Sequence, residues 1–207
     1  MQTKKEAVKT RLMASGLEHF SADGFEKASL RKIVKSAGTT LGNFYNYYAN
    51  KEALFAAIVD ESYLGFKVFL QFHQEQESSG PVQVITPELI ADAAGLLEAQ
   101  IVALIPSLTP SFLLLIDGGK GTKYESFRSD VVDFFAGHYA EHLESQGTDD
   151  SGGYAKVAGS MFVDGMIQIV RETKETSALV GKLMGHFMFF VFGTMGVIDM
   201  RKRLADD

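Results

Sequence analysis

The sequence predicts an all-α protein with an N-terminal head of three helices and a larger C-terminal helical body. Three observations lead to this fold class. Apolar residues recur at helical spacings of three and four, glycines and prolines separate these periodic segments, and 46% of the 207 residues are apolar, including 16 Phe. A chain of this length can bury one large core or two modest ones. We place the domain boundary between the head, residues 1–49, and the body, residues 50–207.

The first helix is expected from about Lys4 to Ala22. Its apolar residues fall on one arc, which would pack into the core of the head. Asp23-Gly24 is the turn signal that follows. The arc consists of Val8, Leu12, Met13, Gly16 and Phe20.

The next stretch has the pattern of a helix-turn-helix. A short amphipathic helix is expected after an N-cap at Ser29, and Gly38 ends it because glycine adopts a left-handed backbone conformation at low cost. A second helix runs to Tyr47 and opens with the cap candidates Thr39 and Thr40. Two short helices joined through glycine place the second, the recognition helix, in the DNA major groove. The apolar face of the first consists of Leu30, Ile33, Val34 and Ala37.

The formal net charge of -6 is distributed unevenly along the chain. Residues 1–51 carry nine Lys/Arg and four Asp/Glu, a net +5, and residues 52–207 carry eleven and twenty-two, a net -11. A basic head offers a local surface for phosphates, while an acidic body discourages non-specific coating of DNA. The alternative is that a short helical domain is basic by chance.

The body is expected to contain six helices separated by loops rich in Gly, Ser and Pro. The first begins at an Asn50 N-cap and connects head and body. Pro87 takes the first helical position of the second, behind a Thr86 cap. Thr122 and Glu125 form a capping box for the fourth. The expected helices are 50–76, 87–105, 110–116, 122–147, 154–173 and 177–203, with clear loops at 78–87 and 147–153.

The last helix contains the apolar run LMGHFMFFVFGTMGVI, residues 183–198. Its apolar residues go nearly all the way round, as expected when one helix meets both its own core and a partner subunit. We therefore expect a homodimer interface here, with a monomer core as the alternative. Sixteen residues fall short of the ~20 that span a bilayer, so no membrane partner is expected.

The stretch AGTTLGNFYNYYANKEAL, residues 37–54, resembles the signature of the TetR (tetracycline-repressor) family of bacterial transcription regulators. An Ala-Gly ends the first short helix, a small hydroxyl residue opens the second, and aromatic residues and Lys-Glu-x-Leu follow. Two departures occur: Tyr48 stands where the family usually has Phe, and Ala49-Asn50 replaces a common Pro-Ser. The resemblance implies a helix-turn-helix DNA-binding head and a helical body for ligand binding and dimerisation.

The resemblance also implies which residues contact operator DNA. Arg31 can pair bidentately with guanine, Asn43 offers an amide to a base edge, and Leu41 can touch a thymine methyl group. Phe44 and Tyr48 are assigned to the core of the head. The predicted DNA contacts are Arg31, Thr39, Thr40, Leu41, Gly42, Asn43, Tyr45, Asn46, Tyr47 and Lys51, of which Thr40, Tyr47 and Lys51 suit phosphates.

The body is expected to bind a small hydrophobic effector. By the resemblance, helices rich in Phe and Met surround a ligand cavity, and polar His138, Asp164 and Gln168 occur at helical spacing beside them. A few polar groups in an apolar cavity orient a ligand, and Met adapts to several ligand shapes. Core packing alone is the alternative. The predicted ligand contacts are Phe66, Phe69, Phe127, Phe134, His138, Phe162, Asp164 and Met166.

No catalytic or cofactor site is predicted. The sequence contains no G-x-S-x-G elbow and no G-x-x-x-x-G-K-[ST] phosphate loop. His138 and His142, spaced i, i+4, could hold a metal with a carboxylate from elsewhere, but histidines lining a core or cavity are the preferred interpretation. The chain has no Cys, which excludes disulfides and thiolate zinc sites. Residues 1–10 contain no apolar signal region, so we expect a cytoplasmic protein.

The sequence therefore predicts a ligand-responsive transcription regulator. We expect a repressor that binds a near-palindromic operator as a dimer and is released by its effector. An architectural or partner-binding helix-turn-helix protein without an effector response is the first alternative. An enzyme that uses the histidine pair is the second.

Overall fold

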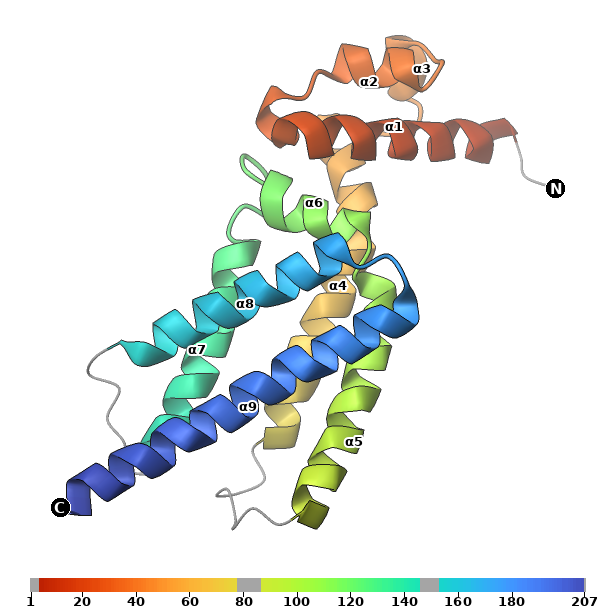
Figure 1. The fold of residues 1–207 in the computed structure, drawn as a ribbon. Helices are drawn as coiled ribbons and strands as arrows, with labels where there is room; N and C mark the ends of the chain where they lie inside the picture. Colours follow the sequence, from red (N-terminus) through yellow and green to blue (C-terminus); the bar gives the residue numbers. More distant parts are fainter. Residues whose placement is uncertain (1–3, 78–86, 146–152, 207) are drawn as a thin grey trace. The chain divides into compact units, whose positions relative to one another are not determined.

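The computed structural model describes residues 4–77, 87–145 and 153–206, and every regular element in these ranges is a helix (Figure 1). The all-α prediction is confirmed. The predicted Thr86 cap and the loops at 78–87 and 147–153 lie outside the described residues, apart from Pro87 and Gly153. The elements are α1 (Lys4–Lys27), α2 (Leu30–Ser36), α3 (Leu41–Phe44), α4 (Lys51–Glu77), α5 (Pro87–Leu104), the 3-10 helix η1 (Ile105–Ser107), α6 (Pro110–Gly118), α7 (Phe127–Ser145), α8 (Tyr154–Glu172) and α9 (Thr176–Asp206).

The chain divides into two compact units. Unit 1 comprises Met1–Val68 and Pro106–Arg128, and unit 2 comprises Phe69–Ile105 and Ser129–Asp207. Helix α4 therefore contributes its N-terminal part to unit 1 and its C-terminal part to unit 2. The functional boundary expected after residue 49 stays a prediction, since the unit that contains the head also contains part of α4 and all of α6.

Unit 1 is built around aromatic rings from α1 and α4. The rings of Phe20, Phe25 and Phe55 lie within 5.9 Å of one another, centroid to centroid, and Phe20 and Phe55 are fully buried. Helix α6 packs on α1, although nearly a hundred residues separate them in sequence. The Tyr124 hydroxyl, in the loop after α6, donates a hydrogen bond to Asp60 on α4. These contacts attach the segment 106–128 to the head.

Several predicted helix ends are confirmed at the level of individual bonds. The Asn50 side chain accepts a hydrogen bond from the Ala53 amide at 2.7 Å and so caps α4. Gly38 follows α2 with φ 63°, the left-handed conformation expected of it. Gly24 turns the chain with φ 72° inside the range of α1. Ser29 occupies the N-cap of α2, but its side chain makes no capping bond.

The predicted recognition helix, Thr39–Tyr47, is too long. Only Leu41–Phe44 is α-helical. The amides of Asn46 and Tyr47 then bond the carbonyls three residues back, at 3.1 and 2.9 Å, which tightens the backbone into turns.

The predicted capping box at Thr122 and Glu125 is also wrong. The Thr122 hydroxyl accepts from the Tyr124 amide and donates to the Gly119 carbonyl, and Glu125 accepts from the Gly121 amide. Both side chains therefore stabilise a turn, and α7 begins only at Phe127.

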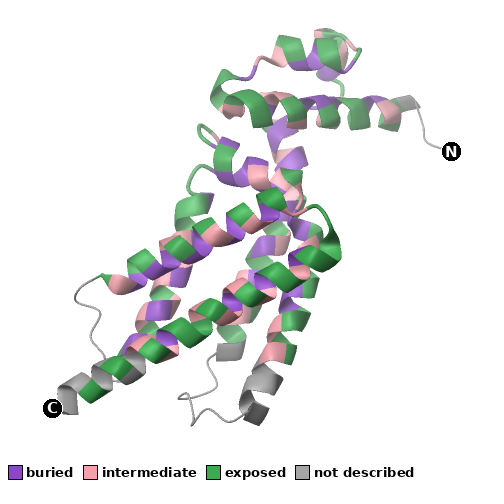
Figure 2. Ribbon diagram, viewed as in Figure 1, coloured by how far each residue is buried: buried purple, intermediate pink, exposed green. Residues whose placement is uncertain are grey.

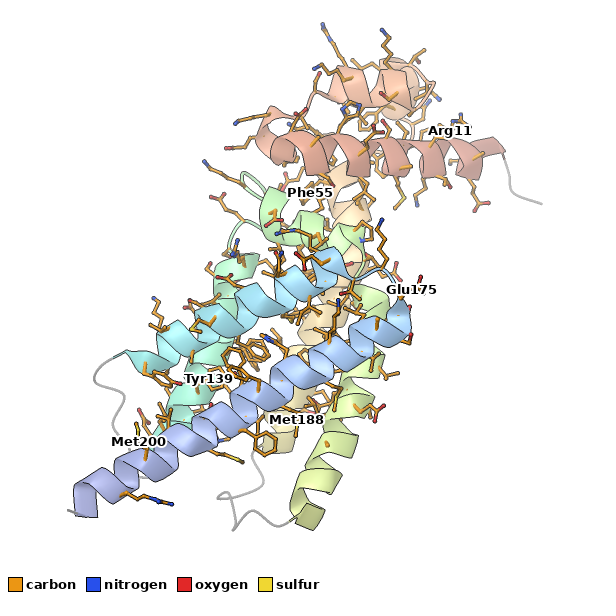
Figure 3. All side chains as sticks on the ribbon, viewed as in Figure 1. Arg11, Phe55, Tyr139, Glu175, Met188 and Met200 are labelled. Carbon is orange, nitrogen blue, oxygen red and sulfur yellow. The ribbon has the colours of Figure 1, made fainter. Side chains whose placement is uncertain are left out.

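Unit 2 has a core of stacked and edge-on rings between α7, α8 and α9. Phe162 on α8 is its centre, with Phe135 at 4.4 Å and Phe187 at 4.7 Å between ring centroids. Tyr139 lies among the same rings (Figure 3). His186 on α9 stacks on Phe162 and donates from Nε2 to its carbonyl at 2.7 Å. Gly165 makes room for this imidazole, since a Cβ there would lie 2.4 Å from it.

Helix α9 keeps much of its apolar surface exposed (Figure 2). Phe189 is 70% exposed and Phe192 44%, and Met161 on the adjacent helix α8 is 59% exposed. Only 22% of Thr176–Val197 is buried within the chain, and this stretch is long and apolar enough to cross a membrane. The expectation that the apolar run is too short to span a bilayer is therefore not supported by the length of the whole helix. Core helices of soluble proteins can be equally long and apolar.

Replacing Tyr48 with Phe is expected to stabilise unit 1. Tyr48 is 6% exposed, and its buried hydroxyl has no hydrogen-bond partner among the described residues. Burial also raises the pKa of this hydroxyl. Removing a buried, unpaired hydroxyl should increase the free energy of unfolding by roughly 1–3 kcal/mol. Urea unfolding of Tyr48→Phe measures the gain, with Tyr45→Phe, whose ring is 55% exposed, as the neutral control; a loss of stability would show that the hydroxyl is bonded in solution.

Candidate DNA-binding site and effector region

The candidate DNA-binding surface is formed by α2, α3 and the turn between them. Helix α2 is held against α1 by two α1 side chains that donate hydrogen bonds to its backbone carbonyls. Ser15 donates to the Ile33 carbonyl at 2.9 Å, and Arg11 donates to the Ala37 carbonyl at 3.1 Å. Ile33 is fully buried, and the carbonyl of Ala37 lies at the C-terminal end of α2. The position of α2 is therefore set by polar bonds from α1 as well as by its apolar face.

Helix α3 is anchored by Phe44 on its inner face and by Tyr48, which lies four residues after the helix ends. Phe44 is fully buried and Tyr48 nearly so, with their rings 5.7 Å apart. Their predicted assignment to the core of the head is confirmed. The Thr40 hydroxyl caps α3 by accepting from the Asn43 amide at 3.2 Å. The other two side chains of α3, Leu41 and Asn43, are half-buried.

Nine of the ten predicted DNA contacts lie on α2, on α3 or in the turns beside α3, and the tenth, Lys51, is the first residue of α4. A Cβ at Gly42 would meet no atom within 4 Å, so backbone there can be approached closely. Tyr45 presents its ring to solvent beside the buried Phe44, 5.4 Å away and edge-on. Arg31, Thr40, Gly42, Tyr45 and Asn46 are exposed, and Thr39, Leu41, Asn43, Tyr47 and Lys51 are half-buried.

A chain of side-chain hydrogen bonds holds the outer face of α3. The side-chain Nδ2 of Asn43 donates to the Thr39 hydroxyl at 2.7 Å, and the side-chain Nδ2 of Asn46 donates to Oδ1 of Asn43 at 3.2 Å. The Asn43 amide is thus oriented before any DNA is present. Thr39, which is predicted as a DNA contact and a helix cap, therefore also orients the Asn43 side chain.

The Lys51 ammonium is bound by the end of α1. Its Nζ donates to the carbonyls of Phe25, Ala28 and Glu26 at 2.6, 3.1 and 3.3 Å, and lies 4.3 Å from the centre of the Phe25 ring. Burial lowers the pKa of this group, and the nearby Glu26 carboxylate opposes the shift. These bonds attach the first turn of α4 to the C-terminal end of α1, and they employ the donors that a phosphate contact would need.

Two of the predicted effector contacts, Phe66 and Phe127, belong to unit 1. Phe66 is fully buried and stacks on Phe112 at 5.2 Å, with Phe127 edge-on at 5.8 Å. Tyr63 packs edge-on against Phe127 at 5.4 Å. In this arrangement the rings fill one another's space as core residues do.

Phe162, Met166 and Asp164 share helix α8 but have different surroundings. Phe162 and Met166 are buried at 2% and 0% exposure, and Phe162 is surrounded by rings. Asp164 is exposed. Gln168, which is predicted as a second polar residue beside the cavity, is exposed and donates to Glu172 on the same helix. The polar residues of α8 are therefore not gathered beside its buried aromatic face.

Phe69, Phe134 and His138 come together in unit 2 around a residue that sequence analysis missed, His73. Its ring lies 6.0 Å from Phe69, 6.3 Å from Phe134 and 4.9 Å from His138. His138 in turn lies 4.4 Å from His142. The sequence does contain a signal for His73, because this residue follows Phe69 by four positions and so lies on the same face of a predicted helix.

The described residues contain no group of three His, Asp or Glu side chains placed to hold a metal ion. His138 and His142 do lie side by side, as their spacing predicted, but their rings meet edge-on. That this pair lines a core or cavity stays a prediction.

Comparison with known proteins relates the N-terminal part of the chain to bacterial regulators. Residues 12–58 match the family model of the bacterial regulatory proteins of the tetR family. The chain is 39% identical over 59 residues to the HTH-type transcriptional regulator UidR of Escherichia coli (strain K12), and 38% identical over 61 residues to the uncharacterized HTH-type transcriptional regulator YdgC of Bacillus subtilis (strain 168). These alignments cover 28% and 30% of this chain, and 30% and 31% of the relatives.

A solved structure of a TetR family transcriptional regulator from Chloroflexus aurantiacus J-10-fl is similar over most of the chain. It is 16% identical, with a TM-score of 0.49, and the match covers 96% of this chain and 93% of that one.

Replacing Lys51 with Met is expected to destabilise unit 1 while leaving the salt dependence of DNA binding unchanged. Methionine keeps the length of the side chain but leaves three carbonyls at the end of α1 without their donor. The free energy of unfolding should fall by roughly 1–3 kcal/mol. Denaturant unfolding and binding isotherms at several salt concentrations measure the two effects, with exposed Lys32→Met as the control. A salt slope reduced by about one would instead support the predicted phosphate contact of Lys51.

Proposed function

Since this chain is a member of the tetR family of bacterial regulatory proteins through its N-terminal domain, we propose that it is a transcription regulator that binds double-stranded operator DNA with α2 and α3. The observation that carries this proposal is the geometry of α3. Its inner face is buried through Phe44, whereas Asn43 on α3 and Thr40, Tyr45 and Asn46 beside the helix are exposed or half-buried. A rigid inner face with a polar outer face is what a recognition helix needs.

In the proposed complex, specificity comes from a few side chains of the head. Arg31 on α2 pairs bidentately with a guanine, and Asn43, oriented by Thr39, offers its amide to a base edge. Leu41 contacts a thymine methyl group. Thr40 and Tyr47 bind phosphates, as does the backbone at Gly42. Tyr45 and Asn46 extend the same surface.

The chain acts as a homodimer through α8 and α9. Half of the large apolar side chains that are exposed among the described residues belong to these helices: Val157 and Met161 on α8, and Phe189, Val191, Phe192 and Met200 on α9. Helices α8 and α9 also pack on each other. Large exposed apolar patches on a soluble chain mark interaction sites, and a two-fold interface uses the same patch on both subunits. This reading accounts for the apolar length of α9 without a membrane and agrees with a cytoplasmic location.

The regulator is a repressor that responds to a small hydrophobic effector bound by unit 2. Helix α4 supports this proposal because one continuous helix carries both Lys51, which binds the end of α1, and His73, which belongs to the aromatic group of unit 2. An effector that binds the DNA-free conformation more tightly shifts the population away from the operator-bound form.

Footprinting on the DNA around its own gene should show a two-fold, near-palindromic site. Because the proposed dimer presents two recognition helices, we expect half-sites about one helical turn, ~34–36 Å, or a small multiple apart. Sedimentation of the chain with and without DNA gives the subunit count, and Phe189→Asp should weaken both dimerisation and operator binding. Protection of a single asymmetric half-site by a monomer would contradict the proposal.

Arg31→Ala should relax sequence preference at one position of each half-site. Loss of a bidentate guanine contact is expected to cost roughly 1–3 kcal/mol on the operator and much less on random DNA. Lys32→Ala is the matched control, since Lys32 is the exposed neighbour on α2 and should weaken operator and random DNA alike. Competition binding with operators changed one base pair at a time measures both variants. Equal losses on operator and random DNA for Arg31→Ala would show that Arg31 contacts only phosphate.

A further inference from the structure

Three of the chain's five histidines form one cluster in unit 2. His73 comes from α4 and His138 and His142 from α7, with centroids 4.9 Å apart for the first pair and 4.4 Å for the second. The Nδ1–H of His73 points to the Gln100 side-chain oxygen on α5, 3.4 Å away. Side chains from three helices therefore meet here, and we call these four residues the histidine cluster.

The histidine cluster differs from a histidine that serves only the core. His186 is the comparison within the same unit: it stacks on Phe162, donates to one backbone carbonyl, and burial lowers its pKa. The three histidines of the cluster are half-buried, as His186 is, but their rings lie against one another. Core packing alone does not require three adjacent imidazoles beside an aromatic group.

The surroundings of the histidine cluster are aromatic. His73 stacks on Phe69 at 6.0 Å and lies 6.1 Å from Phe135 and 6.3 Å from Phe134. Tyr139 lies 5.7 Å from His138. A ligand at the cluster therefore has both imidazole rings and apolar rings as neighbours, the combination that orients an amphiphilic molecule.

We propose that the histidine cluster binds the carboxylate of an organic acid whose apolar part packs on the neighbouring rings, and that such an acid is the effector of this regulator. Each imidazole carries at least one N–H donor, and the two oxygens of a carboxylate can accept hydrogen bonds from more than one of them. A metal ion is the less favoured ligand, since the described residues contain no group of three side chains placed to hold one.

The inference rests on the proposed function for its regulatory part only, because binding of the acid can be measured without DNA. The probes are 2-naphthoate and decanoate, each paired with its neutral amide and titrated calorimetrically into the full chain at pH 7. We expect each acid to bind about ten-fold or more tightly than its amide, the size of effect expected of charge-assisted hydrogen bonds.

The variants His138→Phe and His73→Phe keep an aromatic ring and remove the nitrogens. They should reduce the preference for acid over amide to less than about three-fold while amide binding is kept. His19→Gln is the control: it removes an imidazole from unit 1, where His19 bonds Ser36, and should leave the preference unchanged. Two variants on different helices guard against a loss of folding in one of them, which thermal unfolding reports.

Several outcomes would overturn the inference. These are equal binding of acid and amide, no binding of any probe, or loss of acid and amide binding in equal measure in both variants. Tight binding of Co²⁺ or Ni²⁺ alone, abolished by His138→Phe and blocking the acids, would assign the cluster to a metal instead. Operator binding measured in parallel separates the two proposals: acid-selective binding without any operator binding leaves the site intact and refutes the regulator.

Discussion

A helix of one turn cannot hold its own shape in water, because helix nucleation is unfavourable and only packing compensates for it. Helix α3 consists of four residues, so its outer face keeps its orientation only while Phe44 is buried. The Thr40 cap and the Thr39–Asn43–Asn46 hydrogen bonds then fix the details. The proposed base contacts of Leu41 and Asn43 depend on this one buried ring, and the exposed residues around it contribute chemistry rather than stability.

The same unit shows how a DNA-binding head is joined to the rest of a regulator. Lys51 binds three carbonyls at the end of α1, and the segment 106–128 adds Tyr124, whose hydroxyl bonds Asp60 and whose pKa is raised by burial and by that bond. The hydroxyl oxygens of Ser62 on α4 and of Thr109, the N-cap of α6, are 3.1 Å apart and share a hydrogen bond. Helix α4 is therefore bonded to the end of α1 by Lys51 and to segment 106–128 by Asp60 and Ser62, and α6 of that segment packs on α1. A displacement of this part of α4 would be transmitted to α1.

Aromatic residues serve different purposes in the two units. In unit 1 the rings of Phe20, Phe55 and Phe66 are fully buried and have a packing role. In unit 2 the buried Phe162 has that role, while the rings beside the histidine cluster border half-buried imidazoles. Half of the predicted effector contacts are thus well explained by packing. Of the polar residues predicted beside them, His138 lies in the histidine cluster, whereas Asp164 and Gln168 are exposed.

The sequence by itself determined the all-α class, the helix-turn-helix and most helix boundaries, because apolar periodicity, Gly38 and the Asn50 cap act over a few residues. It misjudged the length of α3 and the role of Thr122, where i to i+3 bonds and a local turn compete with a helix at similar cost. Only the tertiary structure decided that segment 106–128 packs with the head, that Lys51 binds α1, and that His73 meets His138 and Gln100. Those contacts join residues far apart in the chain, and which side chains meet there depends on how the helices pack, which no local pattern encodes.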